Sequence, residues 1–302
     1  MKPEQAIAPE ILRQVKRIEL RTRGLVNSRF AGEYHSVFKG QGMEFSEVRE
    51  YQAGDEVRTI DWNVSARMRR LYVKRFVEER ELTVLLIVDC SGSSRFGTGE
   101  RDKQAMAAEL AAVLALTATR NNDRVGLLLC SDRIEHVVPP RKGRRHALRL
   151  VRDVLAWPSS SRGTDLAVAL DWAARALTHR AVVFVISDFV TPSIERQLTR
   201  LSQRHDLVAV VLDDPGERVL PDLGVVRLVD AETGRLVEID TSAVAVRERY
   251  DRVLAGERAT RQQLLRRLAI DEVLVRTEHG YADPLLRFFN VRETRGRPSR
   301  RR

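Results

Sequence analysis

The pattern of hydrophobic and polar positions changes at about residue 82. Beyond it, continuous apolar runs alternate with segments in which apolar residues recur at helical spacing. Unbroken apolar runs of this length are typical of strands buried on both faces, and their alternation with helices predicts a parallel sheet covered on both sides. The apolar runs are 83–88, 124–131, 181–187 and 206–212, and the helical segments are 102–119, 145–157, 165–177 and 193–203.

The segments on either side of this region have a different texture. Apolar spacing predicts a lead-in helix over 9–24, and glycines and aromatics interspersed with charges predict a small β-rich or irregular module over 30–81. After residue 213, two short apolar stretches flank the turn AETG, which predicts a hairpin at the sheet edge. The predicted organisation is an N-terminal helix and β-rich module (1–81), an α/β domain (82–240), a C-terminal helix, strand and short helix packing on that domain (241–290), and a basic tail (291–302).

Charge and cysteine content modify this picture only slightly. The formal net charge is +10, and six arginines and Glu293 from Asn290 onward contribute +6 − 1 = +5 of it. We therefore expect a frayed basic terminus on a mildly basic body. Cys90 and Cys130 lie in apolar runs, where buried thiols are expected, and no apolar run approaches the ~20 residues of a membrane span. A cytoplasmic protein without a membrane span is predicted.

Candidate chemistry begins where the first apolar run ends. Asp89, Ser91 and Ser93 alternate there, so an extended or turning chain can direct all three oxygens to one point. Thr164 opens a predicted helix and Asp188 ends the third run, and both loops can reach the same edge of a doubly wound sheet. Carboxylate and hydroxyl oxygens suit a hard cation, which predicts a site for Mg²⁺, with Mn²⁺ or Ca²⁺ as alternatives.

Each of these residues also has a purely structural explanation. Thr164 and Asp188, taken singly, are better explained as helix caps or turn residues. Ser91 and Ser93 are also acceptable in turns, but two hydroxyls in register with Asp89 are harder to explain in that way. The combination of all five residues favours the metal site.

The five positions resemble the metal-ion-dependent adhesion site of von Willebrand factor A domains, over roughly residues 82–213. Asp-x-Ser-x-Ser is followed by Gly-Thr-Asp and then by Ser-Asp, as in that family. The resemblance implies that the hydroxyls ligate Mg²⁺, that the acids often act through water, and that a glutamate or aspartate of a binding partner takes the open coordination position. It also implies a fold of the von Willebrand factor A (Rossmann-like) type.

A second resemblance covers the preceding module. The stretch from Gly40 to Glu81 is similar to the signature of the domain-of-unknown-function 58 family, with Glu56 where the family usually has a second aspartate after Asp55. Members of that family are usually encoded beside MoxR-type AAA+ ATPases, so the resemblance implies an adaptor or co-chaperone of such an ATPase. Read without the resemblance, arginines and acids of this stretch form either a structural charge network or a docking surface.

Two other classes of function compete with a protein-interaction module. A metal-dependent hydrolase would share Asp89 and Asp188, but it needs a base or nucleophile beside the metal, and the histidines show no paired or metal-binding spacing. No Walker A loop or nucleophile elbow is present in the sequence. Nucleic-acid binding would rest on the basic tail, but a solvated terminus explains the charge of this tail better. A binding protein rather than an enzyme is predicted.

Overall fold

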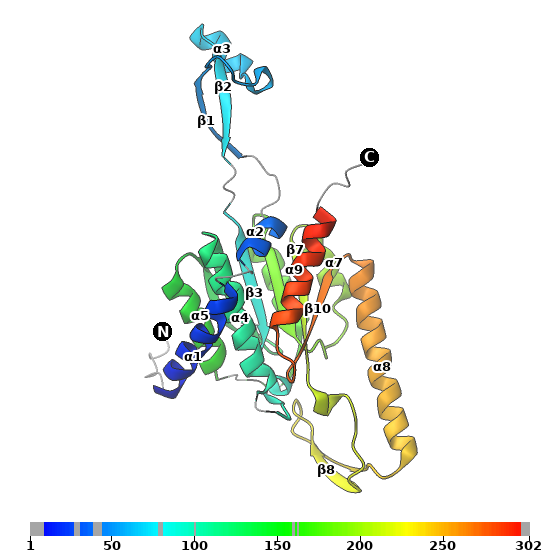
Figure 1. Ribbon diagram of the computed structural model, residues 1–302. Coiled ribbons are helices and arrows are strands. Elements are labelled where there is room, and N and C mark those ends of the chain that lie inside the picture. Colours follow the sequence, from blue (N-terminus) through cyan, green and yellow to red (C-terminus); the bar gives the residue numbers. More distant parts are fainter. Residues whose placement is uncertain are drawn as a thin grey trace.

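Six strands form the central sheet of the computed structural model (Figure 1). The structure describes residues 9–26, 31–38, 44–77, 81–99, 101–158, 161 and 163–296. All neighbouring strands run parallel except β5, which lies antiparallel to β4 at one edge. In the order in which they lie side by side, the strands are β10 (Asp271–Arg276), β7 (Asp206–Asp213), β6 (Val182–Ser187), β3 (Thr83–Asp89), β4 (Arg124–Cys130) and β5 (Ile134–Arg141).

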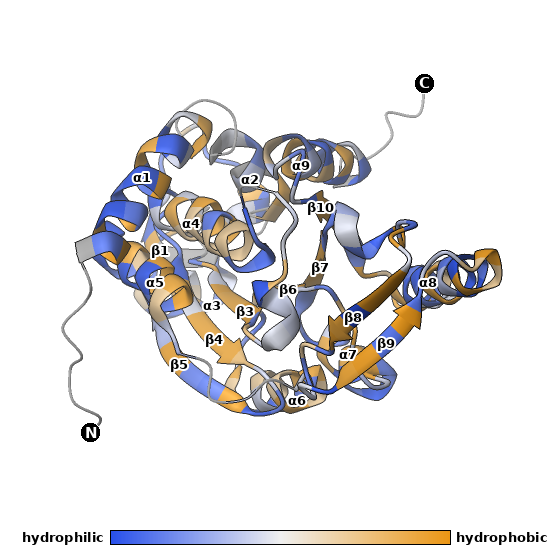
Figure 2. Ribbon diagram, turned by 90° about the horizontal axis from the view of Figure 1, so that it is seen from below, coloured by the Kyte–Doolittle hydropathy of each residue, from blue (hydrophilic) through white to orange (hydrophobic). Residues whose placement is uncertain are grey.

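The alternation of side chains along β3 explains why helices cover both faces. Successive side chains of a strand point to opposite sides, so Leu86 and Val88 join one hydrophobic core while Leu85 and Ile87 join the other. Both helical layers are visible from below (Figure 2). The first layer contains α1 (Pro9–Leu25), α2 (Ala31–Phe38), α4 (Lys103–Arg120), α5 (Arg144–Ala156) and α9 (Ala282–Gly296), and the second contains α6 (Leu166–Ala176), α7 (Glu195–Ser202) and α8 (Val244–Arg267).

The order of the strands creates a switch point beside β3. Counted along the chain, the six strands lie in the order third, second, first, fourth, fifth, sixth, starting from β5. The chain therefore leaves β3 and the adjacent β6 toward opposite ends of the sheet, which opens a crevice beyond their carboxyl ends. The predicted fold class, a doubly wound and mostly parallel α/β sheet, is confirmed.

Two strand assignments differ from the sequence-based expectation. The edge strand β5 was not predicted, because its mixture of polar residues with Pro139 and Pro140 lacks an apolar run, and an edge position tolerates proline. The predicted hairpin is present as β8 (Val225–Val229) and β9 (Leu236–Asp240), but it forms a separate two-stranded sheet. The place beside β7 belongs to β10, so the hairpin does not extend the edge of the main sheet.

Helix α9 shows that the chain does not fray from Asn290. The helix continues to Gly296, so this prediction was wrong for residues 291–296, and residues 297–302 lie outside the described part of the chain. Arg292 donates to both carboxylate oxygens of Asp206 on β7, at 2.8 and 2.6 Å, and its Nε donates to Asp271 on β10 at 2.5 Å. This cation fastens the last helix to two neighbouring strands.

The module before the sheet is a hairpin that carries a short helix. Strand β1 (Glu44–Glu50) pairs antiparallel with β2 (Tyr72–Val77), and α3 (Trp62–Met68) lies in the connection. Asp61 caps α3 by accepting from two backbone amides, while Arg49 binds both carboxylate oxygens of Asp55 at 2.7 Å. The residues that join the hairpin to the rest, 39–43 and 78–80, lie outside the described residues.

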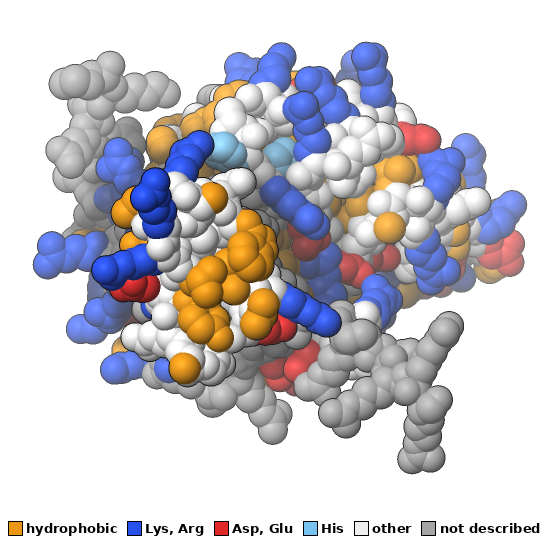
Figure 3. Space-filling view, turned by 90° about the horizontal axis from the view of Figure 1, so that it is seen from above, with side chains coloured by type: hydrophobic (Ala, Val, Ile, Leu, Met, Phe, Trp, Pro, Cys, Tyr) orange, Lys and Arg blue, Asp and Glu red, His pale blue; other side chains and the backbone are white. Residues whose placement is uncertain are grey.

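The outer end of this hairpin module is apolar at its surface. Seen from above, hydrophobic side chains gather there with basic side chains around them (Figure 3). Trp62 is 64% exposed and Val57 is 61% exposed. A contiguous group of exposed apolar side chains is a feature of surfaces that bind other molecules.

Within the described ranges, no helix combines the length and the apolar character that crossing a bilayer requires.

Replacing Arg292 by methionine should destabilise the protein by about 2–4 kcal/mol, because Asp206 loses its two hydrogen bonds from the guanidinium and Asp271 keeps only the exposed Arg295. The guanidinium also lies 5.2 Å from the ring centre of Phe38 and 5.1 Å from that of Phe288. Urea denaturation measures the loss. The control is Arg295→Met, which removes an exposed partner of Asp271 and should cost no more than about 1 kcal/mol. Equal losses for the two variants would contradict this account of the helix anchor.

Candidate functional site

The carboxylate of Asp89 joins two neighbouring strands at the switch point. Asp89 is the last residue of β3, and its Oδ1 accepts from the backbone amide of Ser91 at 2.9 Å. Its Oδ2 accepts from the hydroxyl of Ser187, the last residue of β6, at 2.7 Å. Sequence analysis missed Ser187, although a serine at the end of the adjacent parallel strand is the signal that identifies it.

Ser91 and Ser93 present a pair of hydroxyl oxygens just beyond Asp89. A short 3-10 helix, Gly92–Arg95, turns the chain there, and the two Oγ atoms lie 3.1 Å apart. Two oxygens that bind the same Mg²⁺ at right angles, with bonds of about 2.1 Å, lie about 3 Å apart. The two hydroxyls share a hydrogen bond at this distance, which is also the spacing of one edge of an octahedral Mg²⁺ shell.

Asp188 lies next to this group, but both of its oxygens already have partners. Oδ1 accepts from the backbone amide of Val190 at 3.1 Å, and Oδ2 accepts from the ammonium of Lys103 at 2.7 Å. Phe189, which lies between Asp188 and Val190 in the chain, has a φ of 61°, a left-handed conformation that is unusual for a bulky residue. Backbone of this kind is concentrated at functional sites.

Lys103 is the main residue of this region that the sequence did not reveal. Its side chain is 1% exposed and binds Asp188 and, at 2.6 Å, Glu217. A lone lysine in the first turn of a largely apolar helix was the available signal. Burial by itself lowers the pKa of Lys103, but the two carboxylates outweigh this effect and the net pKa is raised, so the lysine remains a cation.

Thr164 completes the set of predicted residues from a different direction. It lies just before α6, and its hydroxyl donates to Oε1 of Glu232 at 2.7 Å. Glu232 belongs to the turn between β8 and β9, 68 residues away along the chain. Hydrogen bonds thus unite Asp89, Ser91 and Ser93, whereas Asp188 binds Lys103, and Thr164 binds a glutamate that was not predicted to be part of the site.

Burial and a neighbouring negative charge disfavour the ionised form of Asp89. Burial is the main cause that raises its pKa to about 6, and the negative charge of Asp188 adds to the shift. Hydrogen bonds from Ser91 and Ser187 act in the opposite direction and only partly compensate. A cation placed near Asp89 would remove the cost of ionising it.

The chemistry of the donor set decides which metals fit. In the part of the chain that the structure describes, no three His, Cys, Asp or Glu side chains are grouped as a metal site. The oxygens near Asp89 come mainly from neutral hydroxyls, which are hard ligands. Such a set suits Mg²⁺, Ca²⁺ or Mn²⁺ rather than metals that prefer nitrogen or sulfur.

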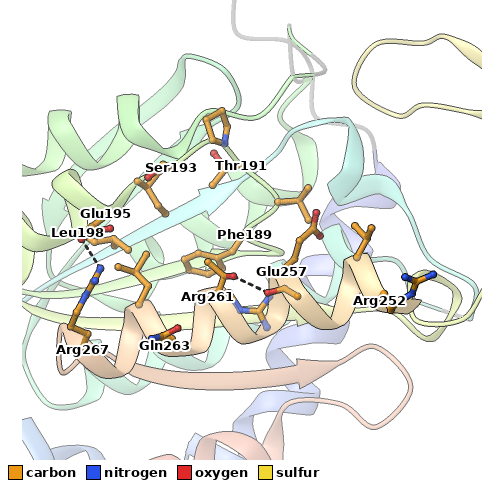
Figure 4. A pocket seen from close by; sticks show the side chains of 17 residues that line it. Phe189, Thr191, Ser193, Glu195, Leu198, Arg252, Glu257, Arg261, Gln263 and Arg267 are labelled. Atoms are coloured by element: carbon orange, nitrogen blue, oxygen red, sulfur yellow. Dashed lines mark hydrogen bonds and ion pairs between the residues drawn. The ribbon is translucent and has the colours of Figure 1, made fainter. Parts of the chain in front are cut away.

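A cleft of about 680 Å³ is lined by Phe189 and the residues that follow it (Figure 4). One wall is formed by Phe189 and the loop that leads into α7, and the other wall is one side of α8. Its lining is mixed, with apolar side chains such as Leu198 and Leu264 near the ion pair of Arg267 with Glu195. The cleft includes Phe189, the residue that follows Asp188, but none of the five predicted site residues lines it.

Comparison with known proteins identifies the family. The family model described as "Protein of unknown function DUF58" matches residues 47–260. This chain belongs to the DUF58 family. The uncharacterized protein Rv1480 of Mycobacterium tuberculosis is 32% identical over 283 residues, which are 93% of this chain and 89% of the relative. The predicted family membership is confirmed.

Solved structures resemble this DUF58 protein more distantly. BatB, a conserved hypothetical protein from Bacteroides thetaiotaomicron, is 13% identical, with a TM-score of 0.48 and coverage of 70% of this chain and 99% of BatB. The VWA domain of SpRpn10 is 16% identical, with a TM-score of 0.34 and coverage of 44% and 76%. The fold class of this DUF58 protein rests on its own strand order and not on these likenesses.

Asp89→Asn should change the pH dependence of stability in the presence of a chelator. The folded pKa of about 6 lies above the ordinary value of 3.8, so the folded state favours the protonated carboxyl. The resulting stabilisation is complete below about pH 4 and is lost as the pH rises through about 6, a change of roughly 3 kcal/mol. Urea denaturation at several pH values should show that the free energy of unfolding of the wild type falls relative to that of the variant as the pH rises over this interval. Parallel curves would mean that Asp89 ionises at its ordinary pKa.

Proposed function

We propose that this protein is a metal-dependent protein–protein interaction module that binds a partner carboxylate through Mg²⁺. Asp89, Ser91, Ser93 and Thr164 supply oxygens to the cation, and Asp188 contributes mainly through its charge. The observation that carries the proposal is the 3.1 Å separation of the two serine hydroxyls beside a buried carboxylate, which matches an edge of an Mg²⁺ shell.

The composition of the donor set favours binding of a further anion. Neutral hydroxyls leave much of the charge of a divalent cation uncompensated, so a carboxylate from another protein is an effective additional ligand. The cleft beside Phe189 offers room for residues that flank this carboxylate. An acidic side chain in an otherwise mixed peptide segment is therefore the chemistry we expect the site to recognise.

The family resemblance supports one class of partner. The resemblance to proteins usually encoded beside MoxR-type AAA+ ATPases supports an adaptor or co-chaperone role, with the ATPase or its client as the partner. The two buried free thiols, Cys90 and Cys130, fit a reducing compartment, and we place this protein in the cytoplasm. The exposed apolar end of the hairpin module is a second surface available for the assembly.

Two alternative functions receive less support from the contacts. A metal-dependent hydrolase needs a carboxylate that can accept a proton from the attacking water. Both oxygens of Asp188 already accept hydrogen bonds within the chain, one of them from Lys103. For nucleic-acid binding, Arg292 in the basic C-terminal region is already held by two aspartates. Neither group is available for the contacts that these functions require.

Capture of partners from a lysate of the source cells tests the proposal directly. Wild type in Mg²⁺ should retain an AAA+ ATPase or its client, and EDTA, Asp89→Ala or Ser91→Ala should each abolish retention. Ser202→Ala is the control, because Ser202 lies at the end of α7, remote from the carboxyl ends of the strands. Retention that ignores both the chelator and the two site variants would rule the proposal out.

Thermal unfolding provides an independent measurement of the cation. Mg²⁺ at about 100 times its Kd should stabilise the wild type by about 2.7 kcal/mol, because it binds the folded state alone. Ser91→Ala should lose this increment and keep the stability that wild type has in EDTA, within about 1 kcal/mol. A metal-independent melting temperature for wild type would contradict the assigned cation site.

A further inference from the structure

The hairpin formed by β8 and β9 presents a glutamate to Thr164, one of the residues proposed to bind the cation. Oε1 of Glu232 lies 2.7 Å from the hydroxyl of Thr164. The hydroxyl donates a hydrogen bond to the carboxylate at this distance, and two oxygens that bind one Mg²⁺ at right angles lie at a similar separation of ~3 Å. Thr164 and Glu232 thus form a second pair of oxygens with the spacing of such a shell, in addition to Ser91 and Ser93.

The turn that carries Glu232 is fixed by its own hydrogen bonds. Oδ1 of Asp230 accepts from the backbone amides of Glu232 and Thr233, at 2.8 and 3.0 Å, and the Gly234 amide donates to the Asp230 carbonyl at 2.8 Å. Gly234 has a φ of 70°, which favours glycine. The turn therefore holds the glutamate in a defined position rather than leaving it on a loose loop.

The rest of the hairpin is held weakly by the α/β body. Val225 and Val229 are each 62% exposed and Leu236 is 70% exposed, so the strands bury little apolar surface. Figure 2, the view from below, shows this apolar hairpin at the end of the molecule where the parallel strands terminate. Among the hydrogen bonds and ion pairs between described residues, the bond of Glu232 to Thr164 joins residues 225–240 to that body.

We propose that Glu232 is a ligand of the cation, supplied by the chain itself, so that cation binding fastens the β8–β9 hairpin to the α/β body. This inference rests on the proposed metal-dependent function. A carboxylate is the strongest oxygen ligand that a hydroxyl-rich Mg²⁺ site can gain. Because little else holds the hairpin, its position should respond to the cation.

Binding of Mn²⁺, measured from the electron paramagnetic resonance signal of the free ion, tests the role of Glu232. Glu232→Gln should weaken binding on the order of tenfold or more, since a charged ligand is replaced by a neutral amide. The matched control is Glu238→Gln on the same hairpin, whose carboxylate pairs with the exposed Arg227. That variant should bind Mn²⁺ as wild type does.

Hydrogen exchange supplies a readout of the hairpin itself. Backbone amides of residues 225–240 should exchange more slowly when Mn²⁺ is added to wild type, and this slowing should be absent in Glu232→Gln. Equal Mn²⁺ affinity and equal slowing in wild type and Glu232→Gln would overturn the role of Glu232 and leave the cation site standing. Failure of wild type to bind Mn²⁺ would overturn both the cation site and this inference.

Discussion

The hydrogen bond between Asp89 and Ser187 is the contact on which the candidate site depends. It joins the ends of β3 and β6, the two strands between which the chain order of the sheet reverses. Both strands are buried on both faces, so polar side chains can be placed only where the strands end. The same constraint that fills the sheet with apolar residues therefore concentrates acids and hydroxyls in one crevice. Burial in this crevice raises the pKa of Asp89.

Charge around this crevice is balanced unevenly. Lys103 compensates Asp188 and Glu217 from within the protein, whereas the hydroxyls of Ser91 and Ser93 bring no charge at all. The surroundings of Asp89 oppose its ionisation, and burial likewise raises the pKa of Glu217 despite its contact with Lys103. Asp89 and Asp188 therefore differ: Asp188 holds the loop after β6 and pairs with Lys103, whereas a cation bound nearby would favour the ionised form of Asp89.

The segments outside the sheet fall into two classes by the way they are attached. Helix α9 is fixed by the two-aspartate contact of Arg292 and by aromatic packing, so it behaves as part of the body. The β8–β9 hairpin and the module carrying α3 instead expose apolar side chains and have their own internal hydrogen bonds. Elements of this kind are suited to respond to a ligand or a partner, because moving them disrupts little buried surface.

The sequence by itself determined the α/β class, the parallel strands and the identity of the Asp89, Ser91 and Ser93 group. Those features are local: unbroken apolar runs can be satisfied only in a doubly covered sheet, and alternation along a turn brings neighbouring oxygens together. Only the tertiary structure decided that β10 takes the edge beside β7, that Lys103 binds Asp188, and that Glu232 meets Thr164. Each of these contacts joins residues far apart along the chain, and a single sequence carries no periodicity that records which distant residues will meet.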